Sequence, residues 1–284
     1  MKADPEELQR AGREGRLIVT EYPYAPRPRP FPRTRGGEAI GALLEAARPR
    51  FSSICRSMLE DAEWFRRIPV RNGGLDDPTP GWVNGMQPAL DGMLLYTLAR
   101  SLQPRTYLEV GSGNSTKFVR RAISDHGLRT RIVSIDPHPR AEVDTLCDEV
   151  VREPFEGVPD ARYRELLSAG DMVFIDNSHR SFQNSDVTVF FTEVLPALPT
   201  GVFYGIHDIF LPDDYPADWS SRFYNEQYLL VAYLLGGAGG DAVVFPGMFV
   251  SGDAESRELL RPILGDAYFA GVEAHAGGFW LEKA

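Results

Sequence analysis

A pair of glycines at the end of an apolar run is the first place where this chain could do chemistry. In residues 106–118 the run stops at Gly111 and Gly113, and a helical pattern follows. Glycine lets main-chain N–H groups approach a ligand, and a helix N-terminus carries unsatisfied donors and a partial positive charge. Asn114 or Ser115 could cap that helix. The stretch predicts a strand, a tight turn and a helix that faces a carboxylate or a phosphate.

A second apolar run, residues 131–135, ends in Asp136, 23 residues after Gly113. An acidic residue at the tip of the neighbouring parallel strand commonly holds a ribose diol. A dinucleotide fingerprint would need a third glycine where Thr116 stands, and a phosphate loop would need Gly before Lys117. The two stretches together predict a site for a nucleoside-bearing cofactor.

Polar residues also follow two later apolar runs. Asp176, Asn177 and His179 come after residues 172–175, and His207 and Asp208 come after residues 202–206. The carboxyl ends of parallel strands meet at one edge of a sheet, so we expect these side chains in the same cleft as the glycine turn.

Two kinds of chemistry are open to this polar set. Asp176, His207 and Asp208 could bind Mg²⁺ or a harder transition ion, provided that the strand has ended before His207, because adjacent strand residues point to opposite faces. Alternatively, His179 or His207 could act as a general base, since an imidazole titrates near neutral pH. The other three histidines have no partner in these motifs and are expected to be structural; they are His126, His138 and His275.

Glu109 stands two residues before the first glycine, where its carboxylate would repel a pyrophosphate but could complement an ammonium group. With Glu109-x-Gly111-x-Gly113 and Asp136, the sequence resembles the class I S-adenosylmethionine-dependent methyltransferases over about residues 87–284. The stretches 171–179, 205–209 and 225–230 resemble later parts of a bacterial branch of that family that acts on small molecules. Ser115 stands where many members have a third glycine.

The resemblance implies S-adenosylmethionine as cofactor, Mg²⁺ as a further candidate, and a small-molecule acceptor, with a hydroxyl as the first expectation. The implied cofactor-binding residues are Glu109, Gly111, Ser112, Gly113, Ser115, Asp136, Asp176 and Asn177. The implied catalytic residues, which would face the acceptor, are Asp176, His179, His207 and Asp208. It also implies a doubly wound, Rossmann-like α/β fold with a seven-stranded, mostly parallel sheet of order 3-2-1-4-5-7-6.

Two other functions stay open at this point. An NAD(P)-dependent Rossmann oxidoreductase would share Gly-x-Gly and the ribose-binding Asp136, although Glu109 and the missing third glycine oppose it. A non-catalytic binding protein could keep the fold and the cofactor, but it would be free to lose the polar set at the strand ends.

Composition narrows the surroundings in which the chain works. The 284 residues carry a net charge of −10, and residues 81–284 hold 16 basic against 28 acidic side chains. This excess of acid would repel polyanions, so no nucleic-acid partner is expected. No apolar run is long enough for a membrane span, the first residues lack a secretory pattern, and Cys55 and Cys147 have no metal-type spacing. We therefore expect a cytoplasmic protein with reduced thiols.

The elements expected around these motifs divide the chain in two. Residues 1–86 are predicted to be a proline-rich extended segment (1–35), two short helices (37–67) and a loop, forming an extension that covers the substrate side, mediates a homodimer or enlarges the core. Residues 87–284 are predicted to be the catalytic domain. Its helices are expected at 91–102, after Gly113, and at 139–147, 160–168, 185–198 and 225–235; its remaining strands at 149–152, 242–245 and 278–281. The loop 211–219, with Asp213, Asp214, Tyr215 and Trp219, is either a lid or solvated surface.

Overall fold

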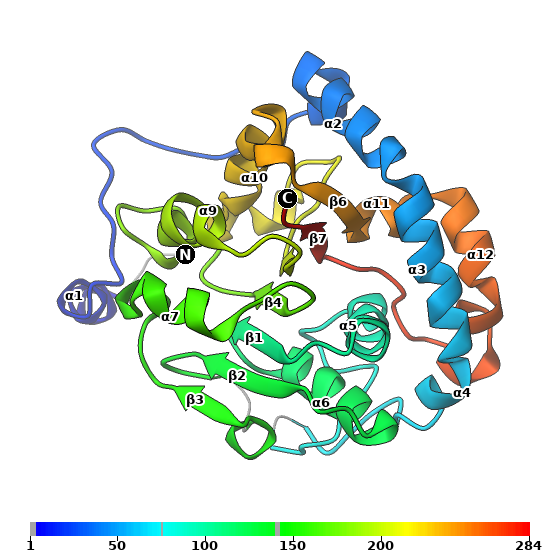
Figure 1. The fold of residues 1–284 in the computed structure, drawn as a ribbon. Coiled ribbons are helices and arrows are strands. Elements are labelled where there is room, and N and C mark those ends of the chain that lie inside the picture. The colour runs from blue at the N-terminus through cyan, green and yellow to red at the C-terminus, as the bar shows by residue number, and fades with distance from the viewer. Residues whose placement is uncertain (1–3, 75, 140–142) are drawn as a thin grey trace.

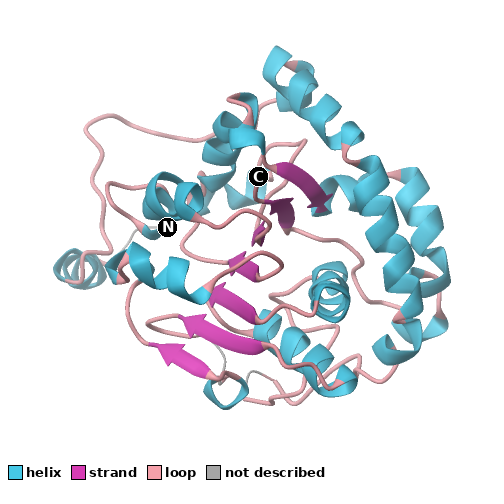
Figure 2. Cartoon of the chain, viewed as in Figure 1, coloured by secondary structure: helices cyan, strands magenta, loops and turns pink. Residues whose placement is uncertain are grey.

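The computed structural model describes residues 4–74, 76–139 and 143–284, which build one mixed sheet with helices on both faces (Figures 1 and 2). The strands are β1 (Thr106–Val110), β2 (Arg131–Ile135), β3 (Glu149–Val151), β4 (Met172–Ile175), β5 (Phe203–Ile206), β6 (Ala242–Pro246) and β7 (Phe279–Glu282). Their order is β3-β2-β1-β4-β5-β7-β6. The first five strands are parallel, and β7 runs antiparallel to both β5 and β6. The predicted fold class is confirmed.

The described residues form twelve α-helices. They are α1 (Pro5–Arg13), α2 (Arg35–Ala46), α3 (Arg48–Glu60), α4 (Ala62–Phe65), α5 (Ala89–Leu102), α6 (Asn114–His126), α7 (Asp160–Leu166), α8 (Asp186–Val189), α9 (Leu195–Ala197), α10 (Glu226–Leu235), α11 (Gly247–Gly252) and α12 (Ala254–Leu264). A π-helical segment, Phe190–Val194, joins α8 to α9, so the predicted helix 185–198 is one continuous helical stretch.

The sheet separates two hydrophobic cores because successive strand residues point to opposite faces. Met172 and Phe174 of β4 lie in the core under α3, α5, α6 and α12. Val173 and Ile175 lie in the other core, against α2, α7, the 186–197 helical stretch and α10. Burial of both faces explains why the parallel strands read as continuous apolar runs in the sequence.

The helices near the N-terminus differ from the prediction. Residues 5–13 form α1 although the segment was expected to be extended, because Asp4 caps the helix and accepts a hydrogen bond from the Glu6 N–H at 3.0 Å. Residues 35–65 form three helices where two were expected. Phe51, Cys55 and Met58 of α3 are buried in the same core as α5 and β7, so α3 is part of the sheet's cover.

Two predictions in the catalytic part also need correction. The helix expected at 139–147 is only a 3-10 turn, Asp144–Leu146, in its described part, and residues 140–142 lie outside the described residues. The connection between β6 and β7, for which no helix was expected, contains α11 and α12. Cys55 and Cys147 are both free thiols. None of the described helices is both long enough and apolar enough to cross a bilayer.

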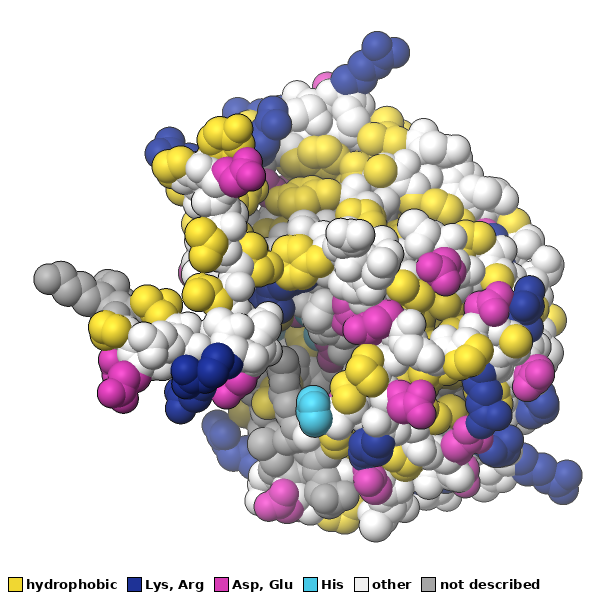
Figure 3. Space-filling model, turned by 90° about the vertical axis from the view of Figure 1, so that its left-hand side faces the viewer, with side chains coloured by type: hydrophobic (Ala, Val, Ile, Leu, Met, Phe, Trp, Pro, Cys, Tyr) yellow, Lys and Arg dark blue, Asp and Glu magenta, His cyan; other side chains and the backbone are white. Residues whose placement is uncertain are grey.

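The parallel strands all end at the same edge of the sheet. Their arrows point to the left of Figure 1, which is the side that faces the viewer in Figure 3. The segment that carries α1 stands off the body on this side, and a hollow lies next to it (Figure 3). The site described below lies at this edge.

Candidate active site

The turn after β1 is built around a glycine that no other residue could replace. Gly111 has φ +80°, and a Cβ there would lie 1.9 Å from the Asp176 carbonyl oxygen. Its N–H donates to the Ile135 carbonyl at 3.0 Å, which ties the turn to the end of β2. Helix α6 then begins at Asn114, with Gly113 as its N-cap, which is one residue earlier than a cap at Asn114 would place it and two earlier than a cap at Ser115. The Thr116 hydroxyl accepts the Gly113 N–H at 3.1 Å, so Thr116 closes the turn from inside the helix.

A cavity of about 830 Å³ opens above this turn. Most of the predicted cofactor residues line it: Gly111, Ser112, Gly113, Ser115, Asp136, Asp176 and Asn177. Predicted catalytic residues line it as well: Asp176, His179, His207 and Asp208. The expectation that the glycine turn and the two later strand ends share one cleft is therefore met by the geometry.

Asp136 is oriented by backbone donors. Its Oδ2 accepts the Ser112 N–H and its Oδ1 accepts the His138 N–H, both at 2.8 Å. A carboxylate has about four lone-pair positions, so two such bonds leave capacity for further donors. Asp136 is only half-buried and lines the cavity. It therefore presents a fixed, partly free carboxylate at the place where ribose hydroxyls were expected.

Glu109 differs from the expectation, because it does not line the cavity. It is completely buried below the turn, where it accepts hydrogen bonds from the Tyr107 hydroxyl, at 2.9 Å, and from the Thr116 hydroxyl. Burial raises the pKa of this carboxyl to about 7, against the hydrogen bonds that lower it. Direct contact between Glu109 and an ammonium group is therefore not what this arrangement offers; Glu109 holds Thr116, and through it the turn.

Two buried amide groups at the cavity are free to donate to a ligand. The side-chain amide nitrogens of Gln87 and Asn177 are buried and have no hydrogen-bond partner among the described residues, and both residues line the cavity. An unsatisfied buried donor costs roughly 1–3 kcal/mol. A polar ligand with acceptor atoms would remove that cost. Gln87 belongs to the loop before α5 and was missed by the sequence reasoning, because nothing in that loop marks it as facing a cavity.

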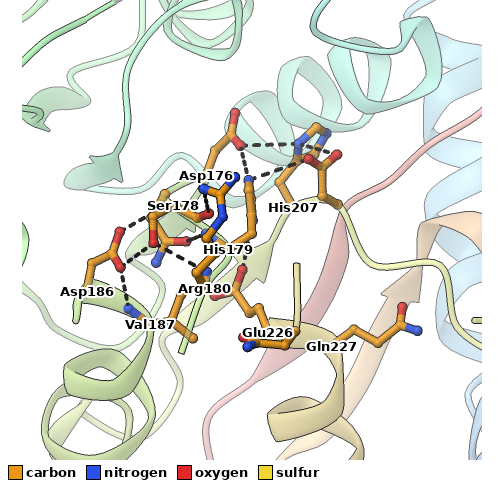
Figure 4. A network of polar contacts seen from close by, with 12 residues as sticks. Asp176, Ser178, His179, Arg180, Asp186, Val187, His207, Glu226 and Gln227 are labelled. Atoms are coloured by element: carbon orange, nitrogen blue, oxygen red, sulfur yellow. Dashed lines mark hydrogen bonds and ion pairs between the residues drawn. The ribbon is translucent and has the colours of Figure 1, made fainter. Parts of the chain in front are cut away.

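The polar residues after β4 and β5 form a compact cluster (Figure 4). The His179 Nε2 lies 3.1 Å from Asp176 Oδ1 and 3.5 Å from Asp208 Oδ2. The His207 Nδ1 lies 3.4 Å from one oxygen of each of the same carboxylates. Strand β5 ends at Ile206, and Asp208 has φ +55°, so His207 and Asp208 both face the cluster despite being adjacent.

Each histidine also has a third carboxylate, a buried one, on its far side. The His179 Nδ1 lies 2.9 Å from Glu226 Oε2, and the His207 Nε2 lies 3.2 Å from Asp91 Oδ2. Asp91 also accepts the N–H groups of Gly277 and Gly278, at 2.6 and 2.9 Å. Both carboxylates fix the orientation of the imidazole that they contact.

These two supporting carboxylates were also missed by the sequence reasoning. The signal for Asp91 was present, because a single acid stands within the apolar stretch of α5. Glu226 looked like an ordinary acid in the first turn of a helix, a position that the helix dipole favours.

The cluster shifts the pKa values of its members strongly. Burial lowers the pKa of His179, but Asp176 and Glu226 outweigh it and raise the pKa to about 10. Burial likewise opposes the charge on His207, yet Asp176 and Asp208 raise its pKa well above the ordinary value. Burial would raise the pKa of Asp176, but its two histidine neighbours hold it well below the usual range. As the residues stand, both imidazoles are proton donors between carboxylates.

The group best suited to a metal differs from the predicted set. Donor atoms of Asp176, His179 and Asp208 all lie within 4.8 Å of one another. His179 thus takes the place expected for His207, because its positive φ of 58° turns the ring back toward the end of β4. From the loop 211–219, only Trp219 reaches the cavity wall. His126 pairs with the Tyr96 hydroxyl at 3.1 Å, away from the site.

Comparison with known proteins agrees with this site. Residues 108–209 match a protein family described as a methyltransferase domain. That range runs from β1 past Asp208 and includes the glycine turn and Asp136. None of the curated proteins matches the chain significantly.

Several solved structures are similar to this chain. The O-methyltransferase TomG from Streptomyces achromogenes, involved in tomaymycin synthesis and solved with SAM, is 20% identical over 69% of this chain and 80% of its own, with a TM-score of 0.39. The SAH-bound methyltransferase PaMTH1 from Podospora anserina is 16% identical over 84% and 96%, with a TM-score of 0.43. MycE from the mycinamycin biosynthetic pathway, solved with Mg, SAH and mycinamycin VI, is 17% identical over 66% and 46%, with a TM-score of 0.36. At TM-scores below 0.5, these similarities say nothing about the acceptor.

The family match assigns residues 108–209 to a methyltransferase domain. The strand order β3-β2-β1-β4-β5-β7-β6 is the one that the resemblance to class I S-adenosylmethionine-dependent methyltransferases implies. The match to a methyltransferase domain and the antiparallel β7, which departs from the dinucleotide-binding sheet, both count against the oxidoreductase alternative.

Proposed function

We propose that this protein methylates a hydroxyl group of a small-molecule acceptor. One observation carries the proposal: the turn suited to the cofactor and the carboxylate–imidazole cluster line the same cavity of about 830 Å³. A cofactor on the turn would bring its reactive end toward acids and imidazoles that can orient a hydroxyl. The reaction then needs positioning and a proton acceptor more than it needs an activated enzyme nucleophile.

The cofactor fits the residues that are present. Asp136 would accept the ribose hydroxyls, the backbone at Gly111 and Gly113 would hold the methionine part, and Gln87 and Asn177 would find acceptors for their unsatisfied amides. S-adenosylmethionine, when bound, supplies a methyl group whose bond to sulfur breaks as its bond to the acceptor oxygen forms. Glu109 contributes indirectly, by fixing Thr116.

The proton of the acceptor hydroxyl would pass to the cluster. Asp176 and Asp208 face the cavity as carboxylates, and His179 lies between them with Glu226 behind it. A hydroxyl between the two aspartates would donate to Asp208, because the two histidines hold the pKa of Asp176 too low for it to accept a proton readily. The neighbouring imidazole would stabilise the remaining negative charge. His207, held by Asp91, stabilises Asp176 from the other side.

We also propose that a divalent ion such as Mg²⁺ binds at this cluster. Four carboxylates, those of Asp91, Asp176, Asp208 and Glu226, surround two imidazoles, so the cluster stays negative even when both imidazoles carry a proton. Asp176 and Asp208 would supply oxygen ligands, which Mg²⁺ prefers, and His179 would complete the set after its Nε2 has released its proton. Such an ion would supply positive charge to the acceptor oxygen.

The remaining proposals concern the setting. We propose a cytoplasmic enzyme without a nucleic-acid partner, because the catalytic part carries an excess of acid. The division into an extension, 1–86, and a catalytic domain, 87–284, remains a proposal, as does a homodimer formed through the extension.

Incubation with S-adenosylmethionine labelled in the methyl group and a panel of hydroxyl-bearing small molecules tests the function. We expect label in an ether that survives mild alkali, together with S-adenosylhomocysteine. The matched control is Asp208→Asn, which should bind S-adenosylhomocysteine but transfer little label. Label in an alkali-labile ester or on nitrogen would refute hydroxyl methylation. A protein that binds the cofactor yet transfers no label, even in an extract of its native organism, would indicate the non-catalytic alternative.

A further inference from the structure

A second cavity, of about 950 Å³, lies beside the first and shares part of its wall. Trp219, Arg222 and Tyr224 line both cavities. The far side of the second cavity is formed by the N-terminal segment, including Arg27 and Tyr24. This segment is attached to the body beside the cavity, because the Arg29 N–H donates to Oδ2 of Asp214, a cavity-lining residue, at 2.8 Å.

Aromatic rings form the floor between the two cavities. The ring of Tyr224 lies 4.7 Å from the ring of His179, between centroids, and 5.6 Å from the ring of Trp219. On the opposite side, Tyr24 lies 6.1 Å from Phe223, and both rings are largely exposed. Such walls suit a planar ligand, which stacks on rings at little entropic cost.

The charge of the second cavity is opposite to that of the whole chain. Four arginines line it, Arg16, Arg27, Arg180 and Arg222, against a single carboxylate, Asp214. Asp214 is already engaged, since it accepts the Arg29 N–H, the Tyr215 N–H and the Tyr228 hydroxyl. The whole chain has a net charge of −10, so the second cavity is a local region in which positive side chains are in excess.

Two of these arginines are poised for a ligand. The guanidinium of Arg222 lies 3.7 Å from the Trp219 ring centroid, and that of Arg180 lies 5.0 Å from the Tyr224 centroid. Neither has an ion-pair partner among residues 4–74, 76–139 and 143–284. Arg180 is held in place by bonds from its Nε to the Arg222 carbonyl, at 2.8 Å, and from its Nη1 to the Ser178 carbonyl, at 3.1 Å. A planar guanidinium with free donors matches a carboxylate, sulfonate or phosphate.

We infer that the second cavity binds the body of the methyl acceptor, and that this acceptor is a planar aromatic compound carrying an anionic group. The anion would contact Arg180 and Arg222, the ring would stack on Trp219 and Tyr224, and the far edge would bring its hydroxyl to His179, which contacts the same tyrosine. The inference rests on the proposed function for the hydroxyl end only. The anion end can be tested without any methyl transfer.

The test uses a matched pair of fluorescent probes, the anionic 1-anilinonaphthalene-8-sulfonate and the neutral N-phenyl-1-naphthylamine, with the full chain saturated with S-adenosylhomocysteine. We expect one site that binds the sulfonate at least tenfold more tightly than the neutral probe. Arg180→Gln/Arg222→Gln should abolish this preference, and the exposed Arg222→Gln alone should reduce it. Arg56→Gln, an exposed arginine on α3 away from both cavities, should leave it unchanged.

Equal affinity for the two probes, absence of binding, or a preference that survives in the double variant would overturn the inference. S-adenosylhomocysteine affinity is measured in the same samples by calorimetry. Unchanged affinity shows that the variants are folded, and absence of S-adenosylhomocysteine binding to the wild type would instead refute the proposed function. The two failures are therefore distinguishable.

Discussion

At the residue scale, the site consists of side chains whose orientation is fixed by others. Asp136 is held by two backbone donors, and each imidazole is held by a buried carboxylate, Glu226 or Asp91. Such support matters because an acceptor that is misplaced by a fraction of an ångström reacts more slowly. Two kinds of residue can therefore be distinguished: those that would contact a ligand, and those that only orient the first kind.

Asp136 and Glu109 give the clearest contrast between these two roles. Asp136→Ala should weaken S-adenosylhomocysteine binding by about 1.5–3 kcal/mol for each charged hydrogen bond lost, with the fold intact. Glu109→Gln should weaken it by less than about 1 kcal/mol, because this carboxylate does not line the cavity and Gln can still accept a hydrogen bond. Calorimetric titration of both variants checks the expectation. A larger loss of S-adenosylhomocysteine affinity in Glu109→Gln than in Asp136→Ala would contradict this contrast, because it would mean that Glu109 holds the ammonium group and that Asp136 does not hold the ribose.

Asp208 distinguishes a metal from a base at the cluster. If Asp176 and Asp208 bind Mg²⁺, Asp208→Asn should lower the rate strongly, because a neutral amide is a poorer ligand for a hard cation, while cofactor affinity stays nearly unchanged. A chelator should then abolish wild-type activity, and Mn²⁺ binding followed by electron paramagnetic resonance should weaken in the variant. Asp213→Asn, an exposed loop acid outside the cavity, serves as the control. Full activity in chelator and no bound Mn²⁺ would exclude the metal and leave an aspartate of the cluster as the proton acceptor.

At the scale of elements, the helices that cover the sheet are joined by buried or half-buried polar contacts. Arg48, the first residue of α3, pairs with both oxygens of Asp253 at 2.9 and 3.0 Å. Asp253 in turn caps α12 by accepting the Ser256 N–H at 2.8 Å. One carboxylate thus links the N-terminal helices to the connection between β6 and β7.

This contact predicts a pH-dependent contribution to stability. The hydrogen bond from Arg48 lowers the pKa of Asp253 to about 2 in the folded state, below its ordinary value near 4. The stabilisation is therefore fully present above about pH 4 and is lost as the pH falls through about 2. Asp253→Asn keeps a capping side chain but loses the ion pair, so it should lower the free energy of unfolding by about 1 kcal/mol at pH 7.

Urea denaturation at pH 7, 4 and 2.5 checks this prediction. The difference between wild type and Asp253→Asn should be constant down to about pH 4 and shrink at pH 2.5. Glu255→Gln, which removes a mostly exposed partner of Arg48, should have little effect at any of these pH values. A difference that is independent of pH would show that the pair does not perturb Asp253.

At the scale of the whole molecule, the sequence predicted the sheet and most of its helices. Strands that are buried on both faces are continuous apolar runs, and helices that pack on the sheet with one face have apolar residues at a 3.6-residue period. It did not predict α1, because proline-rich surroundings concealed a nine-residue helix that Asp4 caps. The site was predicted where residues follow strand ends, as with Asp136 and His207. Asp91, Gln87 and Glu226 were missed, because their roles depend on contacts between segments that are distant in sequence.

The N-terminal segment lies beside the space in which we propose that the acceptor binds. The N-terminal segment stands off the body on the side where the parallel strands end (Figure 3). It meets the body at Asp214, next to the second cavity. The two cavities therefore adjoin, with the glycine turn at Gly111 in the first and most of the arginines in the second.

A crystal structure with bound S-adenosylhomocysteine tests the central claim most directly. We predict that the ribose hydroxyls lie within hydrogen-bonding distance of Asp136, that the amides of Gln87 and Asn177 gain acceptors on the ligand, and that the sulfur faces Asp176, His179 and Asp208. A ligand whose ribose is held elsewhere, or whose sulfur points away from this cluster, would contradict the account.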